Sequence, residues 1–170
     1  LYPLLQRELF IYMTQDEALA YTDKLITTLL EQGMLTEMEQ GLLHPPASSD
    51  RAFHSAWLLS RCMQETFQRY AVVLTIIERE RVISRNSLER TSRQVAERLS
   101  TLYGMNSPEF YDKNVLSSFI SALRENHWLD SAPDGSLKYS EESDALRQDV
   151  LSLVWPEITQ HLQNVEATCG

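Results

Sequence analysis

The chain has 170 residues and a formal net charge of −9, from 15 basic and 24 acidic side chains. Its 43% hydrophobic and 23% charged residues are typical of globular proteins, which excludes disorder and fibrous repeats. The longest apolar run, residues 71–77, is too short for a transmembrane helix. The acidity makes nucleic acid an unlikely main partner, because phosphate binding needs a basic face.

The first residues and the cysteines bear on the extent of the chain and on its redox compartment. The first residue is Leu1 rather than Met, and residues 1–12 already have an amphipathic pattern, so we expect a fragment of a longer protein. The two cysteines, Cys62 and Cys169, have no metal-ligand spacing and form no disulfide framework. This usage fits a reducing compartment.

The first half of the chain predicts two helices. Glycines separate stretches of helical periodicity without any alternation of strands and helices, so the predicted fold class is mainly α. Residues 16–32 form one amphipathic helix, which Gly33 ends. A long central helix over about 49–80 begins at Ser48, Ser49 or Asp50 and joins two ends of the molecule. Its Trp57 and Phe67 are expected in the core.

The second half predicts three more helices. A helix over residues 86–103 begins at a cap formed by Asn86 and ends before Gly104. The next opens at Ser107 and Pro108 and reaches residue 126. A C-terminal helix over about 140–166 is broken or kinked at Pro156.

An internal repeat sets the predicted architecture. Residues 25–43 align on residues 119–137 without a gap, and each copy consists of an amphipathic helix, a hydrophobic exit and a polar turn with glycine. The pattern predicts two small winged-helix-like lobes carrying short β-hairpins, lobe one over about 1–47 and lobe two over about 86–139. Shared ancestry and convergence of short helix–hairpin units both explain it. The identical pairs are Ile26/Ile120, Leu29/Leu123, Glu31/Glu125, Leu35/Leu129, Gly41/Gly135 and Leu43/Leu137.

The sequence offers no catalytic constellation. None of His44, His54, His127 and His161 has an Asp five positions later, and only His161 has an acid there, Glu166. Residues five apart on a regular helix point to different faces, so Glu166 could not orient that imidazole. Nucleophile elbows, phosphate loops and metal-ligand spacings are absent from the sequence. We therefore expect no catalytic residue, no cofactor site and no metal site in this chain.

Charge is unevenly distributed along the chain. Residues 1–50 carry 2 basic and 8 acidic residues, residues 51–130 carry 11 and 9, and residues 131–170 carry 2 and 7. In the basic centre, Arg98 and the five arginines nearest before it are interleaved with glutamates, which indicates solvated helix faces with local ion pairs. The alternative is a surface patch for anionic lipid, an acidic carrier or another domain. These five arginines are Arg79, Arg81, Arg85, Arg90 and Arg93.

Several segments between residues 65 and 129 resemble a known family. ETFQRYA at 65–71, SRQVAERLS at 92–100 and GMNSPEFYDK at 104–113 are similar to the C-terminal region of bacterial membrane-associated glycerol-3-phosphate acyltransferases. The similarity continues through residues 88–89, 117–118, 123–124 and 128–129. Residues 1–64 fit the same placement more loosely, and the tail after residue 131 contributes little.

The resemblance implies a parent enzyme and a role for this region. Such enzymes transfer a fatty acyl group from acyl-CoA or acyl carrier protein to glycerol 3-phosphate, at the cytoplasmic face of the inner membrane. Their catalytic His-x-x-x-x-Asp pair is missing here, so no catalytic residue is carried over. We expect a single accessory domain, soluble by itself, that stabilises or docks on the catalytic domain and contacts acyl carrier protein or anionic lipid.

A competing hypothesis is a self-standing winged-helix adaptor that binds protein or nucleic acid. The helix that would enter a DNA groove carries Lys113, Asn114 and Arg124 beside Asp112 and Glu125, which is weak support for groove binding.

Overall fold

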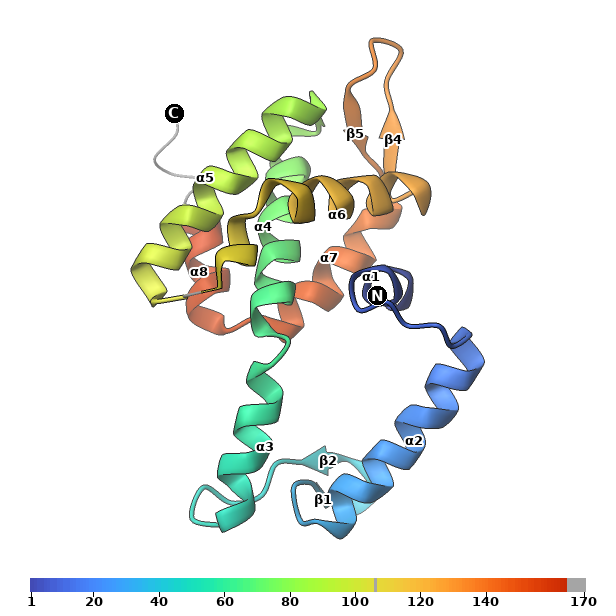
Figure 1. The fold of residues 1–170 in the computed structure, drawn as a ribbon, viewed down its shortest axis with the longest axis vertical. Coiled ribbons are helices and arrows are strands. Elements are labelled where there is room, and N and C mark those ends of the chain that lie inside the picture. The colour runs from blue at the N-terminus through green and yellow to red at the C-terminus, as the bar shows by residue number, and fades with distance from the viewer. Residues whose placement is uncertain (106, 165–170) are drawn as a thin grey trace. The chain divides into compact units, whose positions relative to one another are not determined.

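The fold is mainly α, as predicted, and divides into two units. A computed structural model describes residues 1–105 and 107–164, and in that part of the chain eight α-helices accompany two small antiparallel sheets (Figure 1). Unit 1 combines Leu1–Phe10 with the chain from Gln64 onwards, and unit 2 is Ile11–Met63. Each unit is described below by itself.

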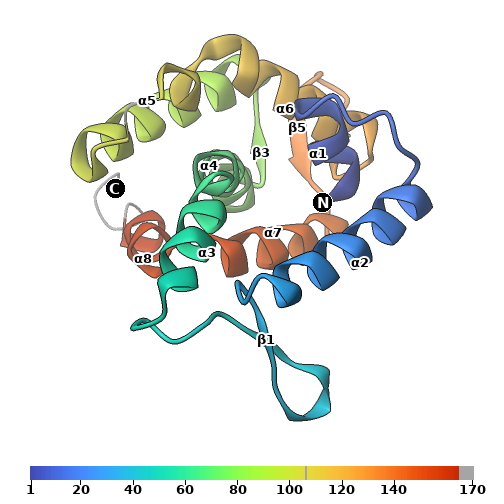
Figure 2. The ribbon, with the colours of Figure 1, turned by 60° about the horizontal axis from the view of Figure 1, so that its bottom comes forward.

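Unit 1 is built around helix α4 (Gln64–Glu80). Its apolar stretch Tyr70–Leu74 is fully buried, as is Ile77, because a helix that is apolar on all faces must be covered on all sides. Figure 2 shows α4 ringed by other helices of the unit. The Tyr70 and Phe119 rings stack inside this core with centroids 4.1 Å apart. The surrounding elements are α1 (Tyr2–Glu8), β3 (Val82–Ile83), α5 (Arg85–Tyr103), the 3-10 helix η2 (Pro108–Tyr111), α6 (Lys113–Glu125), β4 (Leu129–Ser131), β5 (Leu137–Tyr139), α7 (Glu142–Leu153) and α8 (Pro156–Asn164).

The order of elements from α4 to β5 is that of a winged helix: helix, strand, two helices and a hairpin. The three strands lie in the order β3-β5-β4, all antiparallel. The predicted second winged-helix-like lobe is therefore present. It begins earlier than residue 86, because α4 supplies its first helix and β3 its first strand. A two-residue strand such as β3 leaves no period-2 pattern in the sequence.

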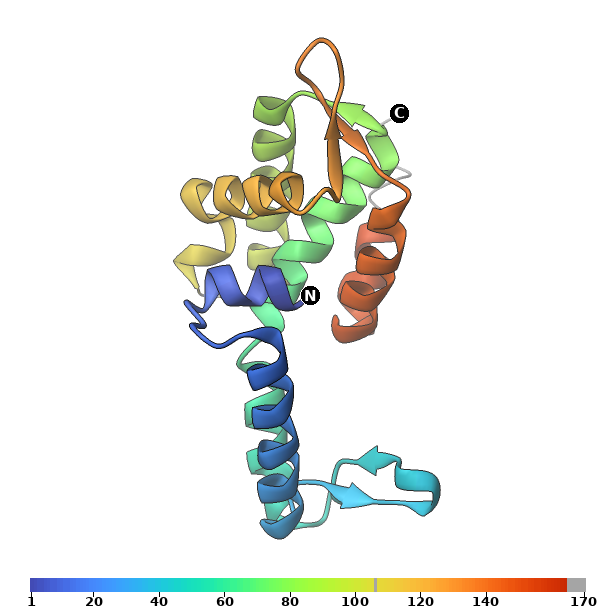
Figure 3. The same ribbon diagram turned by 90° about the vertical axis from the view of Figure 1, so that its right-hand side faces the viewer.

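Unit 2 is a helix, a hairpin and a second helix. Helix α2 (Gln15–Glu31) starts with a capping box between Thr14 and Glu17. Strands β1 (Thr36–Glu37) and β2 (Leu43–His44) flank the 3-10 helix η1 (Glu39–Gly41), and α3 (Arg51–Arg61) follows, capped by Asp50. Figure 3 shows the hairpin extending away from the helix axes. The predicted hairpin of lobe one is thus present.

The two copies of the repeat have the same backbone geometry. Helix α2 ends at Glu31 and α6 at its aligned counterpart Glu125. Each helix closes with the same hydrogen bond: Met34 N donates to Leu29 O (2.8 Å) after α2, and Trp128 N donates to Leu123 O (2.9 Å) after α6. The hairpin glycines Gly41 and Gly135 have φ +75° and +81°, a region that glycine enters without strain.

The hairpin registers also coincide. Thr36 pairs with His44 in one copy, and Asp130 pairs with Lys138 at the aligned positions of the other. The first residue after each outer strand, Met38 or Ala132, donates its N–H across the turn at 2.8 Å. Residues that align in sequence therefore make equivalent backbone hydrogen bonds in the two copies.

The prediction of one long central helix is wrong. Residues 49–80 form α3 and α4, separated at Cys62 and Met63, where the boundary between the units falls. The Cys62 N–H turns back to Leu59 O, and the Gln64 side chain donates to Leu153 O at 2.8 Å, which ties the start of α4 to the end of α7. Since neither proline nor glycine stands at the break, helical periodicity gave no sign of it.

Three smaller expectations also change. Ser84, not Asn86, caps α5, and Asp112 caps α6 after the separate turn η2. Trp57, expected in the core, is 42% exposed, whereas Phe67 packs against the core. Pro156 separates α7 from α8 as predicted. The end of the predicted C-terminal helix, with Glu166, and Cys169 lie outside the described residues.

Candidate functional site

The four histidines do not form a catalytic group. His44 lies on β2, His54 on α3, His127 just after α6 and His161 on α8. The His161 ring meets the edge of Tyr103 at a centroid distance of 6.1 Å. Within the described residues no histidine forms an ion pair with a carboxylate, and no three His, Cys, Asp or Glu side chains converge to hold a metal.

Most arginines of the predicted patch have partners nearby. Arg79 pairs with Glu80, Arg81 with Glu78, and Arg93 with Glu97, at 2.7 to 3.2 Å. The Arg81 guanidinium also lies 4.9 Å from the centre of the Tyr139 ring.

Arg85 has a structural task between two helices. It pairs with Glu89 at 2.9 Å, and it donates to the Ser117 carbonyl and to the hydroxyls of Ser117 and Ser121. These bonds fasten the start of α5 to α6.

A basic pocket lies between α5 and the start of α6. It has a volume of about 360 Å³ and is lined by Arg90, Arg93 and Lys113 together with Asn86 and Glu89. The structure thus brings Arg90 and Arg93 together with a lysine that the predicted patch did not include. Arg79, Arg81 and Arg85 do not line this pocket.

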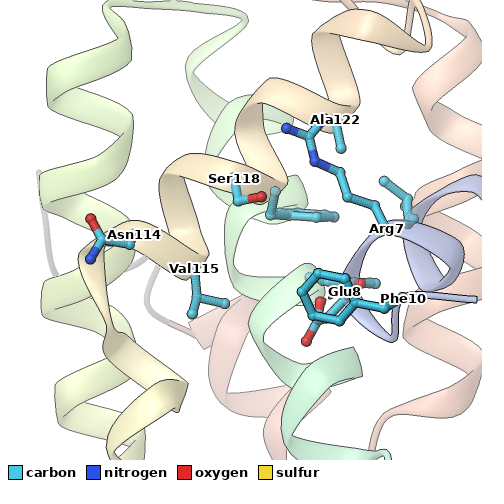
Figure 4. Close-up of a pocket in the computed structure, with 10 residues that line it drawn as sticks. Arg7, Glu8, Phe10, Asn114, Val115, Ser118 and Ala122 are labelled. Carbon is cyan, nitrogen blue, oxygen red and sulfur yellow. Dashed lines mark hydrogen bonds between the residues drawn. The ribbon is translucent and has the colours of Figure 1, made fainter.

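Helix α1 covers the helix that would read a DNA groove. Leu4 of α1 is 1% exposed, and Arg7 pairs with Glu125 of α6 at 2.5 Å. Between α1 and α6 lies a pocket of about 300 Å³, in which Phe10 faces Val115 and Ser118 (Figure 4). Asn114, one of the three candidate groove-reading residues, lines it as well. Helix α1 therefore packs on one face of α6, while Lys113, Asn114 and Arg124 remain exposed.

A buried polar cluster fastens α1 to α4. Glu8 accepts hydrogen bonds from Arg69, from the Tyr70 hydroxyl (2.5 Å) and from the Thr66 hydroxyl (3.0 Å). Arg69 also donates to the Glu109 carbonyl at 3.2 Å. Burial, followed by the hydrogen bond to Glu8, raises the pKa of Tyr70. This cluster could not be predicted from the sequence, because one arginine before an apolar run does not reveal a partner on another helix.

Unit 2 exposes much of its apolar surface. Among its described side chains only Pro46 is buried, although α2, β2 and α3 all carry large apolar residues. A groove of about 360 Å³ between the hairpin and α3 is lined by Met34, Leu35, Leu43, Pro45, Phe53, Ala56, Trp57 and Ser60. The large exposed apolar residues are Tyr12, Met13, Leu19, Tyr21, Leu25, Met38, Leu42, Leu43, Trp57, Leu58 and Leu59.

No helix in the described part of the chain is both long and apolar enough to span a bilayer.

Comparison with known proteins decides the family. A profile described as "Glycerol-3-phosphate acyltransferase C-terminal region" matches residues 1–132. The chain belongs to this family. The resemblance noted from residues 65–129 is thereby confirmed, and the looser fit of residues 1–64 is included in the matched range.

Two curated relatives carry the same enzyme name. A glycerol-3-phosphate acyltransferase of Alteromonas mediterranea is 71% identical over 165 residues, and one of Pseudoalteromonas atlantica is 54% identical over 165 residues. Each match covers 97% of this chain but 20% of the relative. The chain therefore spans about a fifth of the length of these relatives. No solved structure gives a significant match.

Proposed function

We propose that this chain is a non-catalytic C-terminal region of an enzyme that transfers a fatty acyl group from acyl-CoA or acyl carrier protein to glycerol 3-phosphate in phospholipid synthesis. Its role is to dock on the catalytic domain of the same polypeptide and stabilise it, at the cytoplasmic face of the inner membrane. The family match and the names of the two relatives support the enzyme. The match to a C-terminal region that makes up a fifth of the relatives' length supports a non-catalytic role.

The apolar surface of unit 2 carries the docking proposal. A unit of about 50 residues has little capacity to bury apolar surface on its own, and unit 2 leaves leucines of α2, β2 and α3 in contact with solvent. Large exposed apolar patches on soluble proteins mark interaction surfaces. Since the relatives are about five times longer than this chain, the rest of the same polypeptide is the partner at highest local concentration.

A matched pair of substitutions on α2 tests this proposal in the full-length enzyme. Leu25→Asp places a carboxylate on an exposed apolar position, and Thr27→Asp places one on an exposed polar position two residues away. We expect Leu25→Asp to lower the melting temperature and kcat, with the KM for glycerol 3-phosphate unchanged. Thr27→Asp should behave as wild type. Equal behaviour of the two variants would contradict docking through this surface.

The basic pocket on α5 supports a second candidate role, contact with anionic lipid headgroups. Arg90, Arg93 and Lys113 line one concave site, and phosphate groups are attracted by such clusters. Binding of the full-length enzyme to vesicles with anionic lipid should fall after the combined Arg90→Glu and Arg93→Glu change. Arg98→Glu, exposed on the same helix outside the pocket, should not affect it. If the double variant loses affinity for acyl carrier protein while vesicle binding is unchanged, the pocket belongs to the carrier.

The adaptor hypothesis shares the winged-helix order of elements with unit 1, but the family does not support it. The family profile describes an acyltransferase region, and both relatives are named as acyltransferases.

A further inference from the structure

The two copies of the helix–hairpin repeat differ in what surrounds them. In unit 1 the hairpin β4–β5 is completed by β3, with Ile83 opposite Leu137 and Val82 opposite Lys138. In unit 2 the aligned residues Leu43 and His44 form β2, which pairs only with β1 in the described part of the chain. Unit 2 therefore has the counterparts of α6 and of the hairpin β4–β5, but no counterpart of β3 among its described residues.

The free edge of β2 has the hydrogen-bonding direction that a third strand needs. Met38 N donates to Leu42 O at 2.8 Å, so these residues form a hydrogen-bonded pair between β1 and β2. Because such pairs alternate along antiparallel strands, the N–H and C=O of Leu43 point away from β1. The counterpart Leu137 follows an identical bond, from Ala132 N to Ser136 O, and its outward groups face β3.

Side-chain burial differs at the same aligned positions. Phe119 of α6 is 4% exposed and stacks on Tyr70 of α4, and Leu137 of β5 is 2% exposed and pairs with Ile83 of β3. Their counterparts in unit 2, Leu25 and Leu43, are 43% and 40% exposed. The apolar face that unit 1 buries under a helix and a strand is thus open in unit 2.

We propose that a segment of the acyltransferase polypeptide outside residues 1–170 completes unit 2 by adding as an antiparallel strand to β2 at Leu43. This inference rests on the proposed docking function and specifies its mode, β-strand addition. Apolar residues flanking the added strand cover Leu25 and Leu43, as α4 and β3 cover Phe119 and Leu137 in unit 1.

The residue after β2 restricts which strands can be added. In unit 1 the N–H of Tyr139 donates to Arg81 O at 2.8 Å, which extends the pairing of β5 with β3 by one hydrogen bond. The aligned residue in unit 2 is Pro45, which has no N–H to donate. A proline at an exposed edge prevents open-ended pairing with other chains. The edge therefore suits a short strand held nearby by the same polypeptide, rather than a second copy of the chain.

Hydrogen exchange on the full-length enzyme tests the strand directly. With single-residue resolution, we expect the Leu43 amide to exchange about 100-fold or more slowly than an unstructured amide, and we expect the same of the Leu137 amide, which is paired with β3. The Leu137 amide is the internal control. Exchange of Leu43 at the unstructured rate would overturn the inference.

Photo-crosslinking from the same position identifies the strand. With Leu43 replaced by p-benzoylphenylalanine in the full-length enzyme, we expect an intramolecular crosslink to a segment outside residues 1–170. A crosslink to residues 64–164, or to a second molecule, would overturn the proposed source of the strand. The Leu25→Asp experiment separates failure of the strand from failure of docking. Docking without strand addition predicts loss of stability in Leu25→Asp together with an unprotected Leu43 amide.

Discussion

Arg69, which is 4% exposed, forms its ion pair with Glu8, 61 residues earlier in the chain. The bond closes α1 onto α4, and α1 in turn covers the pocket-lining face of α6. The first helix of the chain is therefore part of the folded core of unit 1, although it has only one fully buried side chain, Leu4.

Removing the Glu8 carboxylate should be costly. Glu8→Ala leaves the Arg69 guanidinium buried without its counter-charge, and we expect the free energy of unfolding to fall by about 3 kcal/mol. Urea denaturation of the purified chain measures this. Arg7→Ala is the matched control on the same helix, because it breaks an exposed pair with Glu125 and should cost less than about 1 kcal/mol. Equal losses in the two variants would show that the Glu8 pair contributes no more to stability than the exposed Arg7 pair.

The repeat predicts a stabilising substitution. His127 has φ +61° at the position where the first copy has Gly33, with φ +68°. A residue with a Cβ atom pays a steric cost in this left-handed region. His127→Gly should therefore raise the free energy of unfolding by about 0.5 kcal/mol, after the extra flexibility of glycine in the unfolded chain is counted.

The control for this change is His127→Ala. It removes the same exposed imidazole but keeps the Cβ atom, so no gain is expected. A gain of similar size in both variants, measured by urea denaturation, would mean that the imidazole and not the backbone is the source of strain.

Local features of this fold could be predicted from sequence, whereas the relations between distant elements could not. Asp50, Gly33 and Gly104 mark helix ends in the structure as in the sequence, because capping depends on residues within one turn. The hairpins followed from the repeat for the same reason.

The larger missed features depend on partners far apart in the chain. The break at Cys62 lies beside the bond from Gln64 to Leu153, and helix α1, which packs against α6, is held by the bonds of Glu8 with Arg69 and Tyr70. For the candidate sites, a count of arginines found the basic region. Only the fold could separate Arg90 and Arg93, which share a pocket with Lys113, from Arg85, which fastens α5 to α6.

Tyr139 should make the stability of unit 1 sensitive to alkaline pH. Burial, followed by the hydrogen bond to Asp144 (2.7 Å), raises the pKa of Tyr139 to about 12 from its ordinary value of 10.0. A raised pKa means that the folded state favours the protonated hydroxyl. Its stabilising contribution is complete below pH 10 and is lost as the pH rises from about 10 to about 12.

Tyr139→Phe checks this dependence. The variant loses the bond to Asp144, so it should be less stable than wild type at pH 8 by about 1 kcal/mol. Melting temperatures measured from pH 8 to 11.5 should then converge, because only wild type loses the contribution of Tyr139. Tyr70, whose pKa is also raised, is present in both proteins and cancels in the comparison. A constant difference across this pH range would contradict the assignment.

His161 should have a packing role and no catalytic one. Its ring meets Tyr103 edge-on at an interplanar angle of 90°, an arrangement worth about 1 kcal/mol beyond burial. In the full-length enzyme, His161→Ala should lower the melting temperature by a few degrees, since about 1 kcal/mol is lost, while kcat and the KM for glycerol 3-phosphate stay at wild-type values. His161→Phe keeps an aromatic edge against Tyr103 and should restore the melting temperature. Loss of turnover in both variants with an unchanged melting temperature would instead assign a chemical role to the imidazole.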